Sequence, residues 1–264
     1  MTSKIYDYTD NELKELMTTV QKDGWAIFYE QWMNEGQFTD IFKRTGSCEA
    51  PGQFMNDPDY PEIFRVSGER DEKGARIGMF GDGELGWHSN GNGRSFVDKI
   101  LIGLYCVVGD PNTTLSICNT STPYYDMSDD ERAYYESIIV KIKFKDKTMR
   151  TFDEDDPYLE LAKKTPGSIR PLIGTHPHND LKYFYFPFHF ICEAWEGDKK
   201  IDHEELIEGL KPKIFKSKYQ VHHIFQPGDF ILMDQFTSLH RRTPIGGPGR
   251  LLWRVASDYM NLFD

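Results

Sequence analysis

The chain has 264 residues, enough for one large hydrophobic core, and no linker divides it, so we expect a single domain over residues 1–264. Its 31 basic and 42 acidic residues give a net charge of -11, which argues against binding to nucleic acid or an anionic membrane surface. The four cysteines lack CxxC spacing, and we see no apolar leader and no membrane-spanning run. A cytoplasmic protein is therefore expected.

The first predicted elements are a helix, a buried strand and a second helix. Thr9 and Glu12 have the spacing of a capping box before apolar residues at helical intervals, and Gly24 is placed to end that helix. The compact apolar run at residues 25–28 predicts a strand. Apolar residues at helical spacing then predict a helix over residues 38–46.

Most of the remaining chain is predicted to form strands separated by turns. Strands are expected at residues 62–66, 100–108, 114–117, 139–144, 183–186, 221–225 and 250–256. The turn at residues 109–112 gives the strands on either side of it a hairpin-like geometry. Helices are expected after the capping box of Ser128 and Glu131 and at about 202–210. This pattern predicts a mainly β fold with peripheral helices, a distorted double-stranded β-helix or jelly roll.

Two histidines far apart in the sequence are candidate metal ligands. His88 lies in a turn-rich segment before a strand, and His240 closes the strand that begins after the Pro-Gly turn at residues 227–228. Neither context is typical of a histidine in a packed core. Two neutral imidazoles and one carboxylate suit iron and leave positions open for a cosubstrate and oxygen. Asn90, two residues after His88, stands where that carboxylate is expected.

Arg250 and Arg254 are four residues apart in a predicted strand, so they project onto one face. A guanidinium group matches a carboxylate in bidentate geometry, so either arginine could hold a dicarboxylate beside the metal. Thr114 could add a hydroxyl to the same carboxylate. The alternatives are an exposed pair on an edge strand for the arginines, and simple strand propensity for Thr114.

Other side chains compete as metal ligands. His176 and His178 have metal-like spacing, and His222 is followed by a second histidine. Neighbours in a strand face opposite sides and do not readily share one metal, so we interpret these histidines as structural or surface residues. Asp98 is a more distant candidate for a replacement carboxylate.

Five separated motifs together resemble the TauD/TfdA family of iron(II)- and 2-oxoglutarate-dependent dioxygenases, and the resemblance spans most of the chain. In chain order they are Trp87-His88-Ser89-Asn90, Thr114-Leu115, Thr175-His176-Pro177 with Phe184, Gln226–Asp229 continuing to His240–Thr243, and Arg250 with Arg254. The resemblance implies a distorted jelly roll with added helices. It also implies that oxidative decarboxylation of 2-oxoglutarate to succinate and carbon dioxide is coupled to hydroxylation of a small substrate.

By position, the resemblance implies that His88 and His240 bind iron(II), with Asn90 at the third ligand position. It implies that Arg250 and Thr114 bind the distal carboxylate of 2-oxoglutarate and that Arg254 faces an anionic group of the substrate. The expected partners are a small-molecule substrate and O2. Association into a homo-oligomer is compatible with such a fold.

Asn90 leaves several interpretations open. Its amide oxygen could bind iron as a weaker, neutral donor, or the position could be vacant and filled by water or chloride, as in related halogenases with a small residue there. Asparagine is larger than those residues, so weakened hydroxylation ranks above halogenation. The chain could instead be a catalytically impaired 2-oxoglutarate-binding or sensor protein, or carry an engineered substitution that silences an enzyme. The Asn90-Gly91 pair also favours deamidation, which would create an aspartate.

Overall fold

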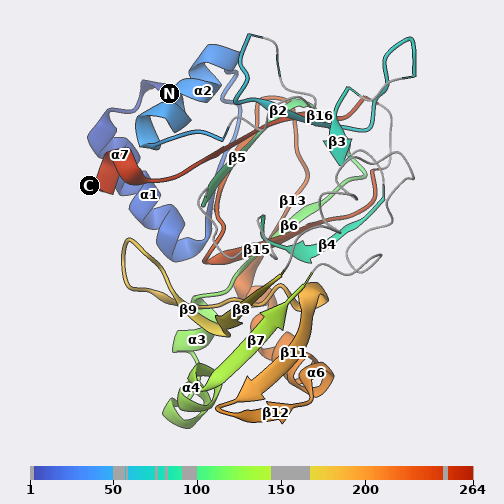
Figure 1. Cartoon of the computed structure of the whole chain (residues 1–264). Coiled ribbons are helices and arrows are strands. Elements are labelled where there is room, and N and C mark those ends of the chain that lie inside the picture. Colours follow the sequence, from blue (N-terminus) through green and yellow to red (C-terminus); the bar gives the residue numbers. More distant parts are fainter. Residues whose placement is uncertain are drawn as a thin grey trace.

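The computed structural model describes residues 3–49, 57, 59–74, 77–80, 83–90, 100–143, 167–245 and 249–263. Two mainly antiparallel sheets form its central part (Figure 1). The larger has the order β1-β14-β5-β16-β2-β3, with strands Trp25–Phe28, Phe230–Asp234, Leu101–Val108, Leu251–Ser257, Phe64–Ser67 and Met79–Phe80. The smaller has the order β13-β6-β15-β4, with strands Gln220–His223, Leu115–Asn119, Ser238–Arg242 and Leu85–His88. The predicted mainly β, jelly-roll fold is confirmed.

The alternation of side chains along β16 shows how the sheets divide the core. Leu252 and Ala256 belong to the apolar cluster between the two sheets. Trp253 and Val255 belong to the cluster between the larger sheet and the N-terminal helices. Because side chains alternate with a period of two, Arg254 faces inward, between the sheets. The charged Arg254 therefore lies in the apolar layer between the two sheets.

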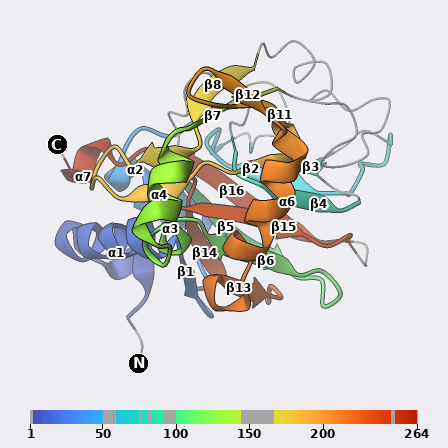
Figure 2. The same cartoon turned by 90° about the horizontal axis from the view of Figure 1, so that it is seen from below.

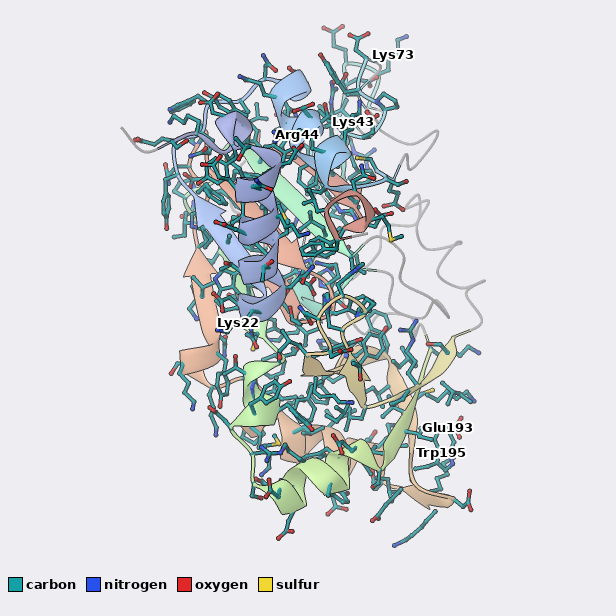
Figure 3. The ribbon with its side chains drawn as sticks, turned by 90° about the vertical axis from the view of Figure 1, so that its left-hand side faces the viewer. Lys22, Lys43, Arg44, Lys73, Glu193 and Trp195 are labelled. Carbon is teal, nitrogen blue, oxygen red and sulfur yellow. The ribbon has the colours of Figure 1, made fainter. Side chains whose placement is uncertain are left out.

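Helices cover the outer face of the larger sheet (Figure 1). They are η1 Ile5–Asp7, α1 Asp10–Asp23, α2 Glu35–Thr45 and α7 Met260–Phe263. The predicted capping box of Thr9 and Glu12 is present, and Gly24 ends α1 in the left-handed region at φ 87°. Arg44 of α2, labelled in Figure 3, donates to Asp10 Oδ1 at 2.9 Å and so fastens α2 to the start of α1. Among the described helices, none combines the length and apolar character required to cross a bilayer.

A third sheet lies beside the smaller one, in the lower part of Figure 1. It has the order β12-β11-β7-β8, with strands Lys199–Ile201, Ile191–Glu196, Ile138–Ile142 and Ser168–Pro171, and a separate pair is formed by β9 Ile173–Thr175 and β10 Lys182–Phe184. The accompanying helices are α3 Thr122–Tyr125, α4 Asp129–Glu136, η2 Phe188–Phe190, α6 His203–Ile214 and η3 Ser217–Tyr219 (Figure 2). Trp87 and Leu239, on the outer face of the smaller sheet, pack into the apolar cluster of this region.

Two predictions about connectivity are wrong. β5 and β6 do not form a hairpin, because β5 pairs with β14 and β16 while β6 pairs with β13 and β15. The segment between them crosses from one sheet to the other, through a turn in which the Asp110 carboxylate accepts hydrogen bonds from Asn112 N at 3.0 Å and Thr113 Oγ1 at 2.5 Å. Likewise His240 does not close the strand after the Pro-Gly turn. That strand, β14, ends at Asp234, and His240 lies in the middle of β15, in the other sheet.

Candidate metal centre

His88 and His240 lie directly opposite each other in the smaller sheet, where β4 and β15 pair in antiparallel fashion. Their ring centroids are 4.3 Å apart, and the two side chains are 9% and 8% exposed. His88 Nδ1 lies 2.7 Å from the carbonyl oxygen of Gly86. A carbonyl only accepts hydrogen bonds, so Nδ1 carries a proton, and in the neutral ring Nε2 is the nitrogen whose lone pair is available to a metal.

A bulge in β4 places His88 and Leu85 on the same face of the sheet. Between the paired positions His240↔His88 and Arg242↔Leu85, β15 advances by two residues but β4 advances by three. The extra residue interrupts strict alternation, so that Leu85 and His88 both line the space between the sheets. Trp87 packs on the opposite face.

These residues line a pocket with about 550 Å³ of empty space, part of it open to solvent. Its described polar lining residues are His88, Asn90, His240, Arg242, Arg250 and Arg254, and its apolar ones are Val66, Phe80, Leu85, Ile102, Leu104, Leu115, Met233 and Leu252. The pocket therefore gathers most of the predicted site residues. In the described part of its wall, three guanidinium groups are present and no carboxylate is.

Asn90 is held by Gln235, which follows β14. The backbone nitrogen and Nδ2 of Asn90 both donate to Gln235 Oε1, at 2.7 and 2.9 Å. The NH2 group thus points at Gln235, and Oδ1 is the atom of the side chain able to bind a metal. Within the described ranges, no cluster of three His, Cys, Asp or Glu residues suited to a metal is found. Asp98 lies outside the described residues.

The three pocket arginines differ in the groups that their guanidinium nitrogens contact. Arg242 is held by backbone carbonyls, of Phe80 through Nη1 and of Gly83 through Nη2 at 2.8 Å. Arg254 Nη1 lies 3.7 Å from Glu49 Oε2. Arg250 is 3% exposed, and its Nη1 has no hydrogen-bond partner among the residues described. Burial lowers the pKa of Arg250 to about 10.

A family model described as taurine catabolism dioxygenase TauD, TfdA family, matches residues 2–256. The chain belongs to the TauD/TfdA family. Pentalenolactone F synthase of Streptomyces arenae is 24% identical over 253 residues, covering 89% of this chain and 79% of the relative. The (S)-phenoxypropionate/alpha-ketoglutarate-dioxygenase of Sphingobium herbicidovorans is 21% identical over 263 residues, covering 97% of this chain and 90% of the relative.

Solved structures have the same fold. A taurine dioxygenase from Burkholderia xenovorans superposes with a TM-score of 0.72 at 16% identity, covering 97% of this chain and 84% of that one. AAD-2, in complex with Mn(II) and N-oxalylglycine, superposes with a TM-score of 0.70 at 15% identity, covering 97% and 91%. TauD/TfdA enzymes use iron(II) and 2-oxoglutarate (alpha-ketoglutarate) and act on small molecules with O2. The predicted family, enzyme class and cofactors are confirmed.

The residues of this TauD/TfdA chain fit those cofactors. Burial, then His88 and Arg254, hold the pKa of His240 well below its usual value, so the ring is neutral and able to act as a ligand. His240 Nδ1 is buried with no hydrogen-bond partner in the described part of the chain. Two neutral imidazoles and an amide oxygen form a donor set for iron, and the unpaired Arg250 Nη1 fits a carboxylate.

Thr114 is not among the residues that line the pocket. It lies just before β6 and is bonded to the end of β15. Its backbone nitrogen donates to Thr243 Oγ1 at 2.8 Å, and Thr243 N donates to its carbonyl oxygen at 3.0 Å. A contact between Thr114 and 2-oxoglutarate stays a prediction.

Three of the other histidines make structural contacts. His176 is fully buried, with Nε2 at 3.0 Å from Asp234 Oδ2, and Tyr259 donates to the same oxygen at 3.0 Å. His223 Nε2 lies 2.9 Å from Asp229 Oδ2, and His222 Nδ1 lies 2.8 Å from the Ser116 hydroxyl. These contacts occupy a ring nitrogen of each of these three histidines.

Sequence reasoning assigned no role to Gln235 or to Arg242. Arg242 is two residues after His240 in β15. Since residues two apart in a strand share a face, its place on the pocket side was predictable from the sequence. Gln235 had no such signal, because its contact with Asn90 joins segments 145 residues apart.

Proposed function

We propose that this chain is an iron(II)- and 2-oxoglutarate-dependent dioxygenase that hydroxylates a small, anionic substrate, releasing succinate and carbon dioxide. One arrangement carries the proposal: the opposed pair His88 and His240 shares a pocket with Arg250, a buried guanidinium whose Nη1 has no partner among the described residues. A pair of imidazoles alone is compatible with many metal sites. The adjacent guanidinium, with its Nη1 free to donate, favours a negatively charged cosubstrate.

Each polar side chain has a defined task in this proposal. His88 Nε2, His240 and Asn90 Oδ1 would hold the iron, which when bound supplies the oxidant from O2 and 2-oxoglutarate. Arg250, with Thr114, binds the distal carboxylate and so fixes the orientation of the cosubstrate. The apolar wall, which includes Leu104 and Met233, excludes water from the reacting groups.

Arg254 supports an anionic substrate. It projects inward from β16 beside Leu252, and its nearest described carboxylate, Glu49, is 3.7 Å from Nη1 and 31% exposed. An anion in the pocket would compete with this partly exposed carboxylate for the guanidinium. The relative from Sphingobium herbicidovorans is named for phenoxypropionate, a carboxylate with an apolar ring, and such a molecule matches a pocket with apolar walls and cationic groups.

Succinate formation tests the proposal. The chain and its Asn90→Asp variant are incubated with iron(II), ascorbate, O2 and 2-oxoglutarate across a panel of small carboxylates and sulfonates. Substrate-dependent succinate from the unsubstituted chain is the expected result. Peptide mass spectrometry of the active material excludes Asn90 deamidation as its cause.

A second candidate function is a 2-oxoglutarate-binding or sensor protein with impaired catalysis. It is favoured by the amide at residue 90, because a neutral donor binds iron more weakly than a carboxylate. Succinate from the Asn90→Asp variant alone, together with 2-oxoglutarate binding by both proteins, would support this candidate. Halogenation ranks lower, because the Asn90 side chain is held in place by Gln235. Incubation with chloride followed by mass spectrometry of the product tests it.

A further inference from the structure

Gln235 is fixed in the turn that joins the two sheets. Its backbone nitrogen donates to the carbonyl of Ile100 at 2.7 Å. Asp234, which precedes Gln235, accepts hydrogen bonds from the two backbone nitrogens that follow Gln235. These are Phe236 N and Thr237 N, each at 2.8 Å from Asp234 Oδ1. The Gln235 side chain itself is 2% exposed. Its terminal amide is therefore held with little freedom at the edge of the metal centre.

The backbone of Asn90 determines which way the Gln235 amide is turned. A backbone N–H only donates, so the atom 2.7 Å from Asn90 N must be the Gln235 oxygen and not its NH2 group. The same oxygen then requires a donor from the Asn90 side chain, which is Nδ2 at 2.9 Å. Both amide orientations thus follow from one fixed N–H group.

We propose that Gln235 is a positioning residue that holds Asn90 with its Oδ1 toward the metal, so that this centre is built for a neutral amide as its third ligand. The proposal rests on the proposed function, since it assumes a metal at His88 and His240. An aspartate at residue 90 would set a carboxylate oxygen against Gln235 Oε1. Turning the Gln235 amide would relieve that repulsion but would set its NH2 group against the backbone N–H of residue 90. An amide satisfies both contacts.

The unpaired end of Gln235 agrees with this orientation. Gln235 Nε2 is buried and has no hydrogen-bond acceptor in the part of the chain that the structure describes. A buried donor without a partner is destabilising, but turning the amide would set Nε2 against the two donors of Asn90 and would not pair it. The acceptor end is directed at Asn90, which is the pattern expected of a residue that orients a metal ligand.

Mn(II) binding in the presence of 2-oxoglutarate tests the proposal without turnover. The loss of the free Mn(II) electron paramagnetic resonance signal on titration gives the affinity. Gln235→Met keeps the length of the side chain and removes the acceptor, and we expect about 10-fold weaker binding, since residues that orient metal ligands typically contribute 10- to 100-fold. Gln235→Glu keeps an acceptor for both donors and should bind at least as well as the unsubstituted chain.

Two comparisons separate positioning from a structural effect. In an Asn90→Ala background, which has no amide to orient, Gln235→Met should change the Mn(II) affinity by less than about 2-fold, because the effects of two coupled residues are not additive. Gln31→Met is the matched control. Gln31 is also buried and accepts a backbone hydrogen bond, from Ile5 N at 2.9 Å, but it does not line the pocket. Its replacement should lower the melting temperature and leave Mn(II) affinity intact.

The outcomes distinguish failure of this proposal from failure of the proposed function. If the unsubstituted chain binds Mn(II) and Gln235→Met binds it equally well, the positioning role is overturned and the proposed function stands. The same holds if Gln235→Met weakens binding equally in the Asn90 and Asn90→Ala proteins. If the folded, unsubstituted chain binds no Mn(II), the proposed function itself is overturned, and this proposal with it.

Discussion

His88 and His240 face each other across the β4–β15 ladder, with ring centroids 4.3 Å apart. Backbone pairing holds both residues, so replacing one ring should remove a ligand without moving the other. We expect His240→Gln to weaken Mn(II) binding by about 100-fold or more, above the range typical of residues that only orient ligands. His222→Gln, on the same sheet but bonded to Ser116, is the control and should retain the affinity. Equal affinities would refute the assignment of His240.

Arg250 should show opposite effects on stability and on binding. A buried guanidinium with an unpaired Nη1 is destabilising in the absence of a ligand, so Arg250→Met should raise the melting temperature of the ligand-free protein. The same change should lower 2-oxoglutarate affinity by about 10- to 100-fold, the range expected for a charged hydrogen bond. Differential scanning fluorimetry with and without 2-oxoglutarate measures both effects. A persisting ligand-induced shift would contradict this role for Arg250.

Stability should fall as the solution is acidified, in part through His189. Burial, and then the charge of Lys211, lower its pKa to about 4 from the ordinary value of 6.5. Between these values the unfolded chain binds the proton and the folded chain does not, so the contribution of His189 to stability is greatest above pH 6.5 and is lost as the pH falls toward 4. His189→Asn should flatten this fall by at most about 1.4 kcal/mol per pH unit. Urea denaturation at several pH values measures the slope, and identical slopes would refute the prediction.

Asp234 should be important for folding. Its carboxylate accepts hydrogen bonds from the fully buried His176, from Tyr259 and from the backbone of the following turn. Because Asp234→Ala leaves several buried donors unpaired, we expect it to lower the free energy of unfolding by about 3–5 kcal/mol. Asp202→Ala, which removes the N-cap of α6, should cost only about 1 kcal/mol and serves as the comparison. Similar losses in the two variants, measured by urea denaturation, would contradict the prediction.

Local chemistry made several elements predictable. The capping boxes at Thr9 and at Ser128 are both present, and the strand at residues 25–28 has the predicted bounds. Pairing between distant segments was harder, as the failed hairpin of β5 and β6 shows, because the hydrophobic pattern of a strand does not say which sheet it joins. The short strand β12, Lys-Lys-Ile, was missed because it has too few apolar residues to produce a pattern.

The candidate site was predictable to the extent that its residues lie in motifs. His88, Asn90, His240, Arg250 and Arg254 meet at one pocket, as their motifs indicated. What the sequence could not provide was the surroundings of each side chain. The orientation of Asn90 depends on Gln235, and the lack of a partner for Arg250 Nη1 among the described residues depends on which acceptors the fold brings near it.

The bulge in β4 accommodates one extra residue in the wall of the pocket. Leu85 and His88 are three residues apart, and they share the inner face only because the bulge interrupts strict alternation. Deleting Gly86 would remove the bulge and leave these two residues two positions apart, so that regular alternation would keep both on the inner face, opposite Arg242 and His240. Loss of this residue in a related chain would therefore spare the histidine pair and change the local bend of the strand that borders the substrate space.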